Sequence, residues 1–210
     1  EGHFQLNDRV DTYLPQFKDP VVILDPKTGK DGASEPAKTP IRIIHLLTHT
    51  SGITHGLTPT TLDAEFTKAV KSQSVKTIND RVNAIASFPL IGHPGEQWFY
   101  SVSPDVLSLL IEHFSGMSTK EFLQGRLFDP LGMEDTFYNV PKDKQNRMAM
   151  LHVIDSEGNL SLNPSQTPME GNTVYGGRNG LFSTARDYLK FCQLYLDEGR
   201  AGEQQLLSRK

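Results

Sequence analysis

The chain has 210 residues and a net charge of −4, and it carries no block of basic residues. A nucleic-acid partner is therefore not expected, and no apolar run approaches the length needed to span a membrane. The length suffices for one domain with a hydrophobic core or for part of a larger domain. The single cysteine, Cys192, excludes an internal disulfide. It lies in an apolar helical pattern, which predicts a small core residue rather than a nucleophile.

The first 90 residues predict short elements separated by strong turn signals. Proline and glycine at positions 15, 52 and 89 end three of these elements. The elements expected are a short helix starting at Asn7 or Asp8, a strand at 21–24, a polar surface loop at 27–39, and helices at 40–49, 60–72 and 79–88.

The stretch 94–118 combines a turn, a short apolar run and a helix. Ser103 is expected to cap the helix, with Pro104 in its first turn and Gly116 just past its end. Tyr100 ends the strand-like run 98–100, directly before the helix begins. On local sequence alone, Tyr100 is interpreted as a packing residue under the helix start.

The remaining chain is again rich in helix signals. Ser118 and Glu121 have the spacing of a capping box, and 155–158 has the form of a hairpin turn. The elements expected are a helix at 119–128, a hairpin of strands 148–154 and 159–162, a short strand at 173–175, a glycine-rich turn at 176–180, and a helix at 184–197 capped by Ser183. The glycines of the turn permit close approach of the backbone to another group.

Three histidines match the spacing of a zinc-protease motif. His45, His49 and His55 fit the pattern H-x-x-x-H-x-x-G-x-x-H. Position 46 is leucine, although that chemistry needs a glutamate there as general base. The alternative interpretation, histidines that bond the backbone at a helix end, is therefore preferred, and no metal site is expected.

Other catalytic patterns are absent or misplaced. Lys27-Thr28-Gly29 matches the K-T-G motif of serine β-lactamases, but it lies in a polar loop ahead of every other candidate, so it is interpreted as coincidence. The chain contains no G-x-S-x-G, and no lysine follows a serine by three positions. The glycines at 176–180 match neither a P-loop nor a dinucleotide fingerprint.

Five stretches together resemble one family, the serine β-lactamase and penicillin-binding-protein-like hydrolases. They occur in the family's order and span nearly the whole chain. The five are LNDRVDTYLPQF, PIRIIHLLTHTSGI, PGEQWFYSVSPDVLSLLIEHFSG, FDPLGMEDTFY and GGRNGLFSTARDYLKF. The resemblance implies an α/β (α+β) fold, a mixed sheet with a helical subdomain. Residues 1–210 would be the central part of one such domain, mainly its helical subdomain.

The resemblance also implies what Tyr100 does. The family's nucleophile and lysine lie in Ser-x-x-Lys before the first of these stretches, and its third motif lies on a strand beyond residue 210. Only the middle motif, Tyr-x-Asn, falls inside, as Tyr100-Ser101-Val102. Tyr100 would be the general base toward the serine. Because an unperturbed tyrosine has a pKa of about 10, it needs a nearby cation such as that lysine.

Val102 departs from the family motif, where asparagine donates to a substrate amide. The form Tyr-Ser-x-x-x-Asp-Val-Leu resembles the esterase branch. The resemblance thus implies a serine hydrolase acting through an acyl-enzyme on small ester-type acyl substrates, inactive as these 210 residues. The alternatives are a β-lactamase or D-Ala-D-Ala carboxypeptidase, and a non-catalytic relative that binds a ligand or partner.

The remaining expectations concern binding and context. Gly176 and Gly177 are candidate substrate-binding residues. No cofactor is expected. A chain that lacks strands of its sheet exposes an edge, which favours self-association. The compartment stays open between the bacterial periplasm and the cytoplasm.

Overall fold

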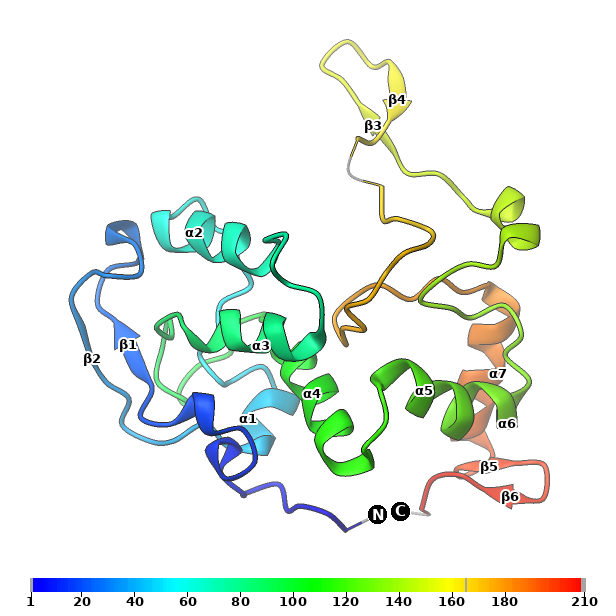
Figure 1. The fold of residues 1–210 in the computed structure, drawn as a ribbon, viewed down its shortest axis with the longest axis horizontal. Coiled ribbons are helices and arrows are strands. Elements are labelled where there is room, and N and C mark those ends of the chain that lie inside the picture. The colour runs from blue at the N-terminus through cyan, green and yellow to red at the C-terminus, as the bar shows by residue number, and fades with distance from the viewer. Residues whose placement is uncertain (1, 165, 209–210) are drawn as a thin grey trace. The chain divides into compact units, whose positions relative to one another are not determined.

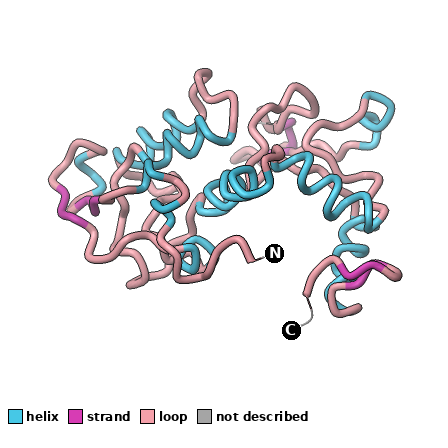
Figure 2. The backbone as a smooth tube through the Cα atoms, turned by 60° about the horizontal axis from the view of Figure 1, so that its bottom comes forward, coloured by secondary structure: helices cyan, strands magenta, loops and turns pink. Residues whose placement is uncertain are grey.

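The computed structural model describes residues 2–164 and 166–208, which form two compact units (Figure 1). The first unit runs to Phe122 and takes in Val174–Asn179; the second comprises Leu123–Thr173 and the residues from Gly180 onward. Helices and loops make up most of both units, and strands are only short segments (Figure 2). The expected helix-rich α/β composition is confirmed.

Among the described residues, four α-helices lie wholly in the first unit: α1 (Ile43–Leu47), α2 (Thr61–Val70), α3 (Ile78–Ala86) and α4 (Ser103–Ser115). Helices α3 and α4 pack together, and α1 contacts α4 while α2 contacts α3 (Figure 1). The other elements are the 3₁₀ turns Val10–Thr12, Pro15–Phe17 and Pro26–Thr28, and strands β1 (Val21–Ile23) and β2 (Ser34–Pro36). The predicted helices 60–72 and 79–88 are confirmed within two residues at each end.

The hydrophobic core of the first unit lies between these helices. Phe66 of α2, Val82 of α3 and Val106 of α4 are almost completely buried in one cluster. Burying side chains of this size contributes about 1.5–3 kcal/mol each to folding. Apolar positions repeat at helical spacing in all three helices, so the sequence orients each helix toward the core.

The polar stretch 27–39 contains a strand, and its prediction as a loop throughout is wrong. Strand β2 pairs antiparallel with β1, with Val22 opposite Glu35. All three residues of β2 are exposed, so β2 shows none of the apolar alternation that identifies a strand from sequence. The Lys27-Thr28-Gly29 triplet lies at a 3₁₀ turn rather than on a strand, and Lys27 is exposed.

Helix α4 starts and ends close to the predicted positions, but its cap differs. Val102 is the N-cap residue, without a side-chain cap bond, and Ser103 is the first helical residue. The hydroxyl of Ser103 bonds other serines instead of its own helix. Gly116 ends the helix in the left-handed conformation, and its N–H donates to the carbonyl of Glu112, as predicted.

The second unit is built from shorter elements. Helix α5 (Thr119–Leu123) begins in the first unit with the predicted capping box of Ser118 and Glu121, and its last residue is the first of the second unit. The further elements of the second unit are a π-helical turn (Gln124–Phe128), α6 (Asp129–Leu131), a 3₁₀ helix (Lys142–Arg147), β3 (His152–Ile154), β4 (Leu160–Leu162), α7 (Ala185–Leu196), β5 (Arg200–Ala201) and β6 (Gln204–Gln205).

Two local predictions for this region are confirmed and one is wrong. Strands β3 and β4 pair as the expected hairpin, and the carboxylate of Asp155 accepts from the backbone N–H groups of Glu157 and Asn159 in its turn. Helix α7 begins one residue later than expected. Residues 173–175 form no strand.

Thr184, not Ser183, caps α7. The Thr184 hydroxyl accepts from the N–H of Asp187, whereas the Ser183 hydroxyl bonds Thr136. The buried carboxylate of Asp187 accepts from the N–H of Asp135 and from the Thr136 hydroxyl. The start of α7 is therefore tied to the segment 135–136 of the same unit.

Cys192 on α7 is exposed, so its prediction as a core residue is wrong. Its neighbours along the helix, Tyr188, Tyr195 and Leu196, are exposed as well. Of the apolar positions on α7, Leu194 is buried. The sequence pattern identifies the helix but does not select which apolar side faces the unit's interior. In the part of the chain that the structure describes, no helix has the length and hydropathy of a membrane span.

Asp135 provides a prediction about acid stability. Hydrogen bonds from Arg147, reinforced by Lys144, lower the pKa of Asp135 from 3.8 to about 2. Because the folded pKa is depressed, the stabilisation is present above pH 3.8 and is lost as the pH falls through 2. Carbon-13 NMR of the carboxyl group should give a midpoint near 2. Arg147→Ala should raise that midpoint more than Lys144→Ala; an unchanged midpoint in both variants contradicts this assignment.

Candidate active site around Tyr100

Tyr100 lies in an irregular segment of the first unit, directly before α4. The predicted strand-like run 98–100 is not a strand. Tyr100 is 57% exposed and Trp98 is 64% exposed, so the interpretation of Tyr100 as a packing residue under the helix start is wrong. An exposed phenol beside a rigid helix start is accessible to a reactant.

Two histidines lie against the ring of Tyr100. The His55 ring stacks on it, with 4.7 Å between centroids and 18° between planes. The His49 ring lies 5.2 Å away at an angle of 38°, and Trp98 is 6.3 Å away. Aromatic pairs at such distances contribute about 0.5–1.5 kcal/mol each beyond the area they bury, so the cluster restricts the phenol despite its exposure.

His49 also bonds the backbone on both sides of Tyr100. Its carbonyl accepts from the N–H of Phe99 at 2.8 Å. Its ring Nδ1 accepts from the N–H of Ser101 at 3.2 Å. His49 adopts φ 55°, a left-handed conformation that costs a residue other than glycine about 1–3 kcal/mol. Strain of this kind persists only where the surrounding contacts enforce it.

Behind Tyr100, three serine hydroxyls form a buried chain. Ser101 and Ser103 share a hydrogen bond of 2.6 Å, and Ser103 and Ser51 share one of 2.9 Å. The Ser101 hydroxyl also lies 3.2 Å from Nδ1 of His49. This Ser–His contact is no nucleophile pair, because Ser101 is 2% exposed and its hydroxyl already accepts from the N–H of Ser103. The hydrogen-bonded serine hydroxyls instead fix the backbone segment that carries Tyr100.

His55 is a neutral partner for Tyr100 at pH 7. Burial, with a smaller contribution from the positive charge of Arg178, lowers the pKa of His55 below 6.5. Its buried Nδ1 has no hydrogen-bond partner among the described residues. His55 therefore offers the phenol an apolar, stacked face rather than a positive charge.

Val102 lies two residues after Tyr100, and its side chain faces the core. It is completely buried within the hydrophobic cluster of the first unit. The family's asparagine position is thus filled here by a side chain that has no donor and no access to solvent.

A buried carboxylate anchors the region next to the site. Asp105, in the first turn of α4, has no exposed area, and its Oδ2 lies 3.1 Å from Nε of Arg178 and 3.6 Å from Nη1 of Arg81. Its Oδ1 accepts from the backbone N–H of Arg178 at 3.3 Å. Burial lowers the pKa of Arg81, while the charge of Asp105 opposes that shift. One carboxylate therefore joins α3, α4 and the glycine turn at 176–180.

The two candidate substrate-binding glycines pack against this carboxylate and the start of α4. A Cβ on Gly176 would lie 2.5 Å from Oδ1 of Asp105. One on Gly177 would lie 2.3 Å from the carbonyl oxygen of Pro104. Packing alone thus requires glycine at both positions, and their contact with substrate stays a prediction.

The three histidines of the zinc-like pattern do not converge. Nδ1 of His45 accepts from the N–H of Arg42 at the start of α1, whereas His49 and His55 lie against Tyr100. Across the described residues, no group of three histidine, cysteine or acidic side chains is placed to hold a metal ion.

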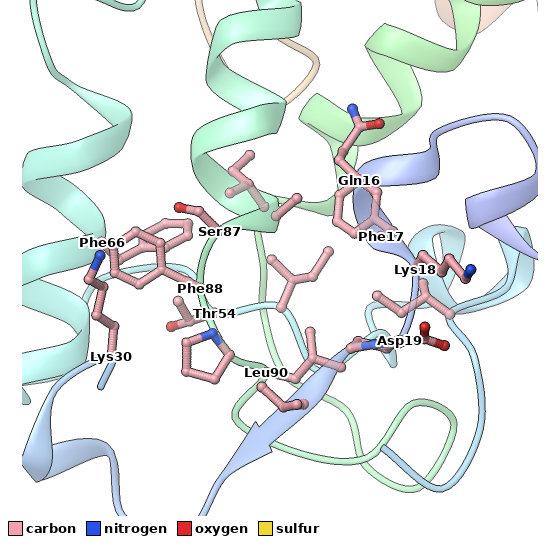
Figure 3. Close-up of a pocket in the computed structure, with 17 residues that line it drawn as sticks. Gln16, Phe17, Lys18, Asp19, Lys30, Thr54, Phe66, Ser87, Phe88 and Leu90 are labelled. Atoms are coloured by element: carbon pink, nitrogen blue, oxygen red, sulfur yellow. The ribbon is translucent and has the colours of Figure 1, made fainter. Parts of the chain in front are cut away.

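A separate pocket of about 200 Å³ opens in the first unit (Figure 3). Phe66, Phe88 and Leu90 line it, and Nζ of Lys30 lies 5.9 Å from the Phe88 ring. Its lining includes Thr54 but neither Tyr100 nor the two histidines that contact it.

Comparison with known proteins gives the family. The family described as Beta-lactamase matches residues 1–210. The structure is similar to that of Simvastatin Synthase (LovD) from Aspergillus terreus, with a TM-score of 0.73 and 25% identity over 97% of this chain and 50% of that one. It also matches EstCE1, described as a hydrolase with promiscuous acyltransferase activity, with a TM-score of 0.71 and 22% identity over 96% of this chain and 54% of that one. These matches define a β-lactamase- and transpeptidase-like fold. The chain belongs to the Beta-lactamase family.

Sequence relatives agree with this assignment. An uncharacterised protein of Mycobacterium tuberculosis is 30% identical over 213 residues, which cover 99% of this chain and 51% of that protein. Lovastatin esterase of Penicillium rubens is 27% identical over 213 residues, covering 93% of this chain and 50% of that protein. The chain spans about half the length of the curated relatives it matches. The resemblance inferred from the five stretches is confirmed.

Proposed function

We propose that the chain contributes the general base, Tyr100, to a serine acyl-hydrolase or acyltransferase that acts on ester-type substrates. The observation that carries the proposal is the exposed phenol held by two histidines beside a buried helix start. Membership of the Beta-lactamase family and relatives named as an esterase and an acyltransferase support it. The nucleophilic serine and its lysine would lie outside these 210 residues.

The proposed reaction has two steps. Tyr100 accepts the proton of the serine hydroxyl as the serine oxygen bonds the carbonyl carbon of the ester. The bond to the alcohol breaks, the alcohol leaves with that proton, and an acyl-enzyme remains. In the second step, the oxygen of water or another alcohol bonds the acyl carbon and gives its proton to Tyr100; the bond between that carbon and the serine oxygen breaks, the serine oxygen takes the proton back from Tyr100, and an acid or a new ester is released. Backbone N–H groups would stabilise the oxyanion in both steps.

Val102 supports esters over β-lactams and peptides as substrates. A substrate amide needs a donor for its carbonyl at the position of the family's asparagine, and the buried valine provides none. An ester substrate without that amide loses no hydrogen bond when valine stands in place of the asparagine. We therefore expect a chromogenic ester to be turned over faster than a chromogenic cephalosporin.

The test compares two proteins: the 210-residue chain and the same chain extended at both ends by the residues that flank it in its gene. The extended protein should hydrolyse p-nitrophenyl butyrate with a burst of p-nitrophenol, because an acyl-enzyme accumulates. The 210-residue chain should be inactive, because it holds a base without its nucleophile. A folded extended protein without esterase activity would favour a non-catalytic binding relative, and turnover by the short chain would contradict the proposed division of the catalytic groups.

A further inference from the structure

We propose that His49 is a positioning residue for Tyr100, fixing the phenol by bonding the chain on both sides of it. The consequence for catalysis rests on the proposed function, since it matters only if Tyr100 transfers a proton. The hydrogen bonds themselves do not depend on that function. The two parts can therefore be tested separately.

His49 accepts two hydrogen bonds from the backbone of the segment 99–101. Its carbonyl binds the N–H of Phe99 at 2.8 Å, and its ring Nδ1 binds the N–H of Ser101 at 3.2 Å. Tyr100 is the residue between them, and its ring lies 5.2 Å from the imidazole. A side chain whose flanking residues are both anchored to one group has little freedom to change direction.

The bond from Ser101 also fixes which nitrogen of His49 carries the proton. A nitrogen that accepts from a backbone N–H has a free lone pair, so neutral His49 holds its proton on Nε2. The Ser101 hydroxyl lies within hydrogen-bond distance of the same Nδ1. Hydrogen bonds from Ser101 to Ser103 and from Ser103 to Ser51 fix the position of that hydroxyl. The buried hydroxyls thus support one tautomer and one ring orientation.

The backbone of His49 provides an independent observation. His49 is held at φ 55°, where asparagine and glycine are tolerated better than other residues. This backbone conformation makes His49→Asn and His49→Gly an informative pair of variants. Asparagine retains an acceptor close to the position of Nδ1, glycine removes it, and both accept the backbone conformation.

His45 supplies a matched control. Its Nδ1 accepts from the N–H of Arg42 at 3.2 Å, the same kind of bond at the same length. That bond lies at the start of α1 rather than beside Tyr100. His45→Ala therefore removes an equivalent hydrogen bond without releasing the phenol.

The experiment measures ester hydrolysis by the extended protein. His49→Gly should lower kcat about tenfold to a hundredfold with a much smaller change in KM, because displacing a reacting group by about 1 Å has effects of that size. His49→Asn should recover most of the loss, and His45→Ala should leave kcat close to that of the parent. Equal kcat values for His49→Gly and His49→Asn, or a loss confined to KM, would overturn the proposal.

Nitrogen-15 NMR of histidine-labelled extended protein provides the second measurement and needs no variant. In the neutral imidazole of His49, Nδ1 should be unprotonated and Nε2 protonated. A proton on Nδ1 would exclude the bond from Ser101 and overturn the proposal even where a variant fails to fold. If Tyr100→Phe keeps full activity while His49 shows the expected tautomer, the function of Tyr100 is wrong and the positioning holds.

Discussion

Tyr100→Phe in the extended protein is expected to lower kcat for ester hydrolysis by about 10²–10⁴-fold, the usual contribution of a general base. Phenylalanine keeps the ring, and with it the stacking on His55 at 4.7 Å, but removes the group that accepts the serine proton. Because the phenol hydroxyl makes no hydrogen bond within the described residues, its loss should leave stability almost unchanged. Stopped-flow measurement of p-nitrophenol release separates the acylation rate from KM.

Tyr13→Phe is the matched control for this substitution. The Tyr13 hydroxyl donates to Oδ2 of Asp8 at 2.7 Å, so that variant loses a structural hydrogen bond and no candidate catalytic group. We expect a small loss of stability and an unchanged kcat. A Tyr100→Phe variant as active as Tyr13→Phe would show that the base is another group.

Asp105→Ala is expected to lower the free energy of unfolding by about 3–5 kcal/mol, the size of effect seen when one partner of a buried ion pair is removed. Asp105 is fully buried, and among the described residues it is the carboxylate that pairs with both Arg81 and Arg178. Without the carboxylate, two largely buried guanidinium groups repel each other, and the N–H of Arg178 loses its acceptor. Urea unfolding followed by circular dichroism measures the change.

Two further variants test the origin of this effect. Asp105→Asn keeps the size and one acceptor but removes the charge, so most of the loss should remain. Asp135→Ala, which removes a carboxylate paired with Arg147 and Lys144 near the surface, should cost much less. Equal losses for Asp105→Ala and Asp135→Ala would contradict the role of burial.

The sequence predicts the long helices well because their signals are local. Helices α2, α3 and α4 carry apolar residues at helical spacing with threonine, proline or glycine at their ends. The hairpin β3–β4 is predicted by its turn, in which Asp155 bonds the following N–H groups. Local chemistry fails where a side chain bonds a distant partner. Ser103 is a good cap by type, but Ser51 and Ser101 hold its hydroxyl instead.

The candidate site is predictable only in part for the same reason. The family motif identifies Tyr100, and the histidine spacing singles out His49 and His55, but as a metal pattern rather than as partners of the phenol. No local pattern pairs Asp105 with Arg178, which follows it by 73 positions. An arginine inside a glycine-rich turn and an aspartate in the first turn of an apolar helix are the available signals, and each has an ordinary local explanation.

The return of Val174–Asn179 to the first unit has a consequence for the order of folding. On the ribosome, residues up to Phe122 emerge well before Arg178. The carboxylate of Asp105 therefore lacks one of its two counter-ions until Arg178 has emerged. Closing the intervening loop of about 50 residues costs roughly 3.5 kcal/mol of chain entropy when that loop is still unstructured. The first unit therefore completes its folding only after the intervening segment has been synthesised. A nascent chain paused before Arg178 should be more sensitive to protease than one released after it.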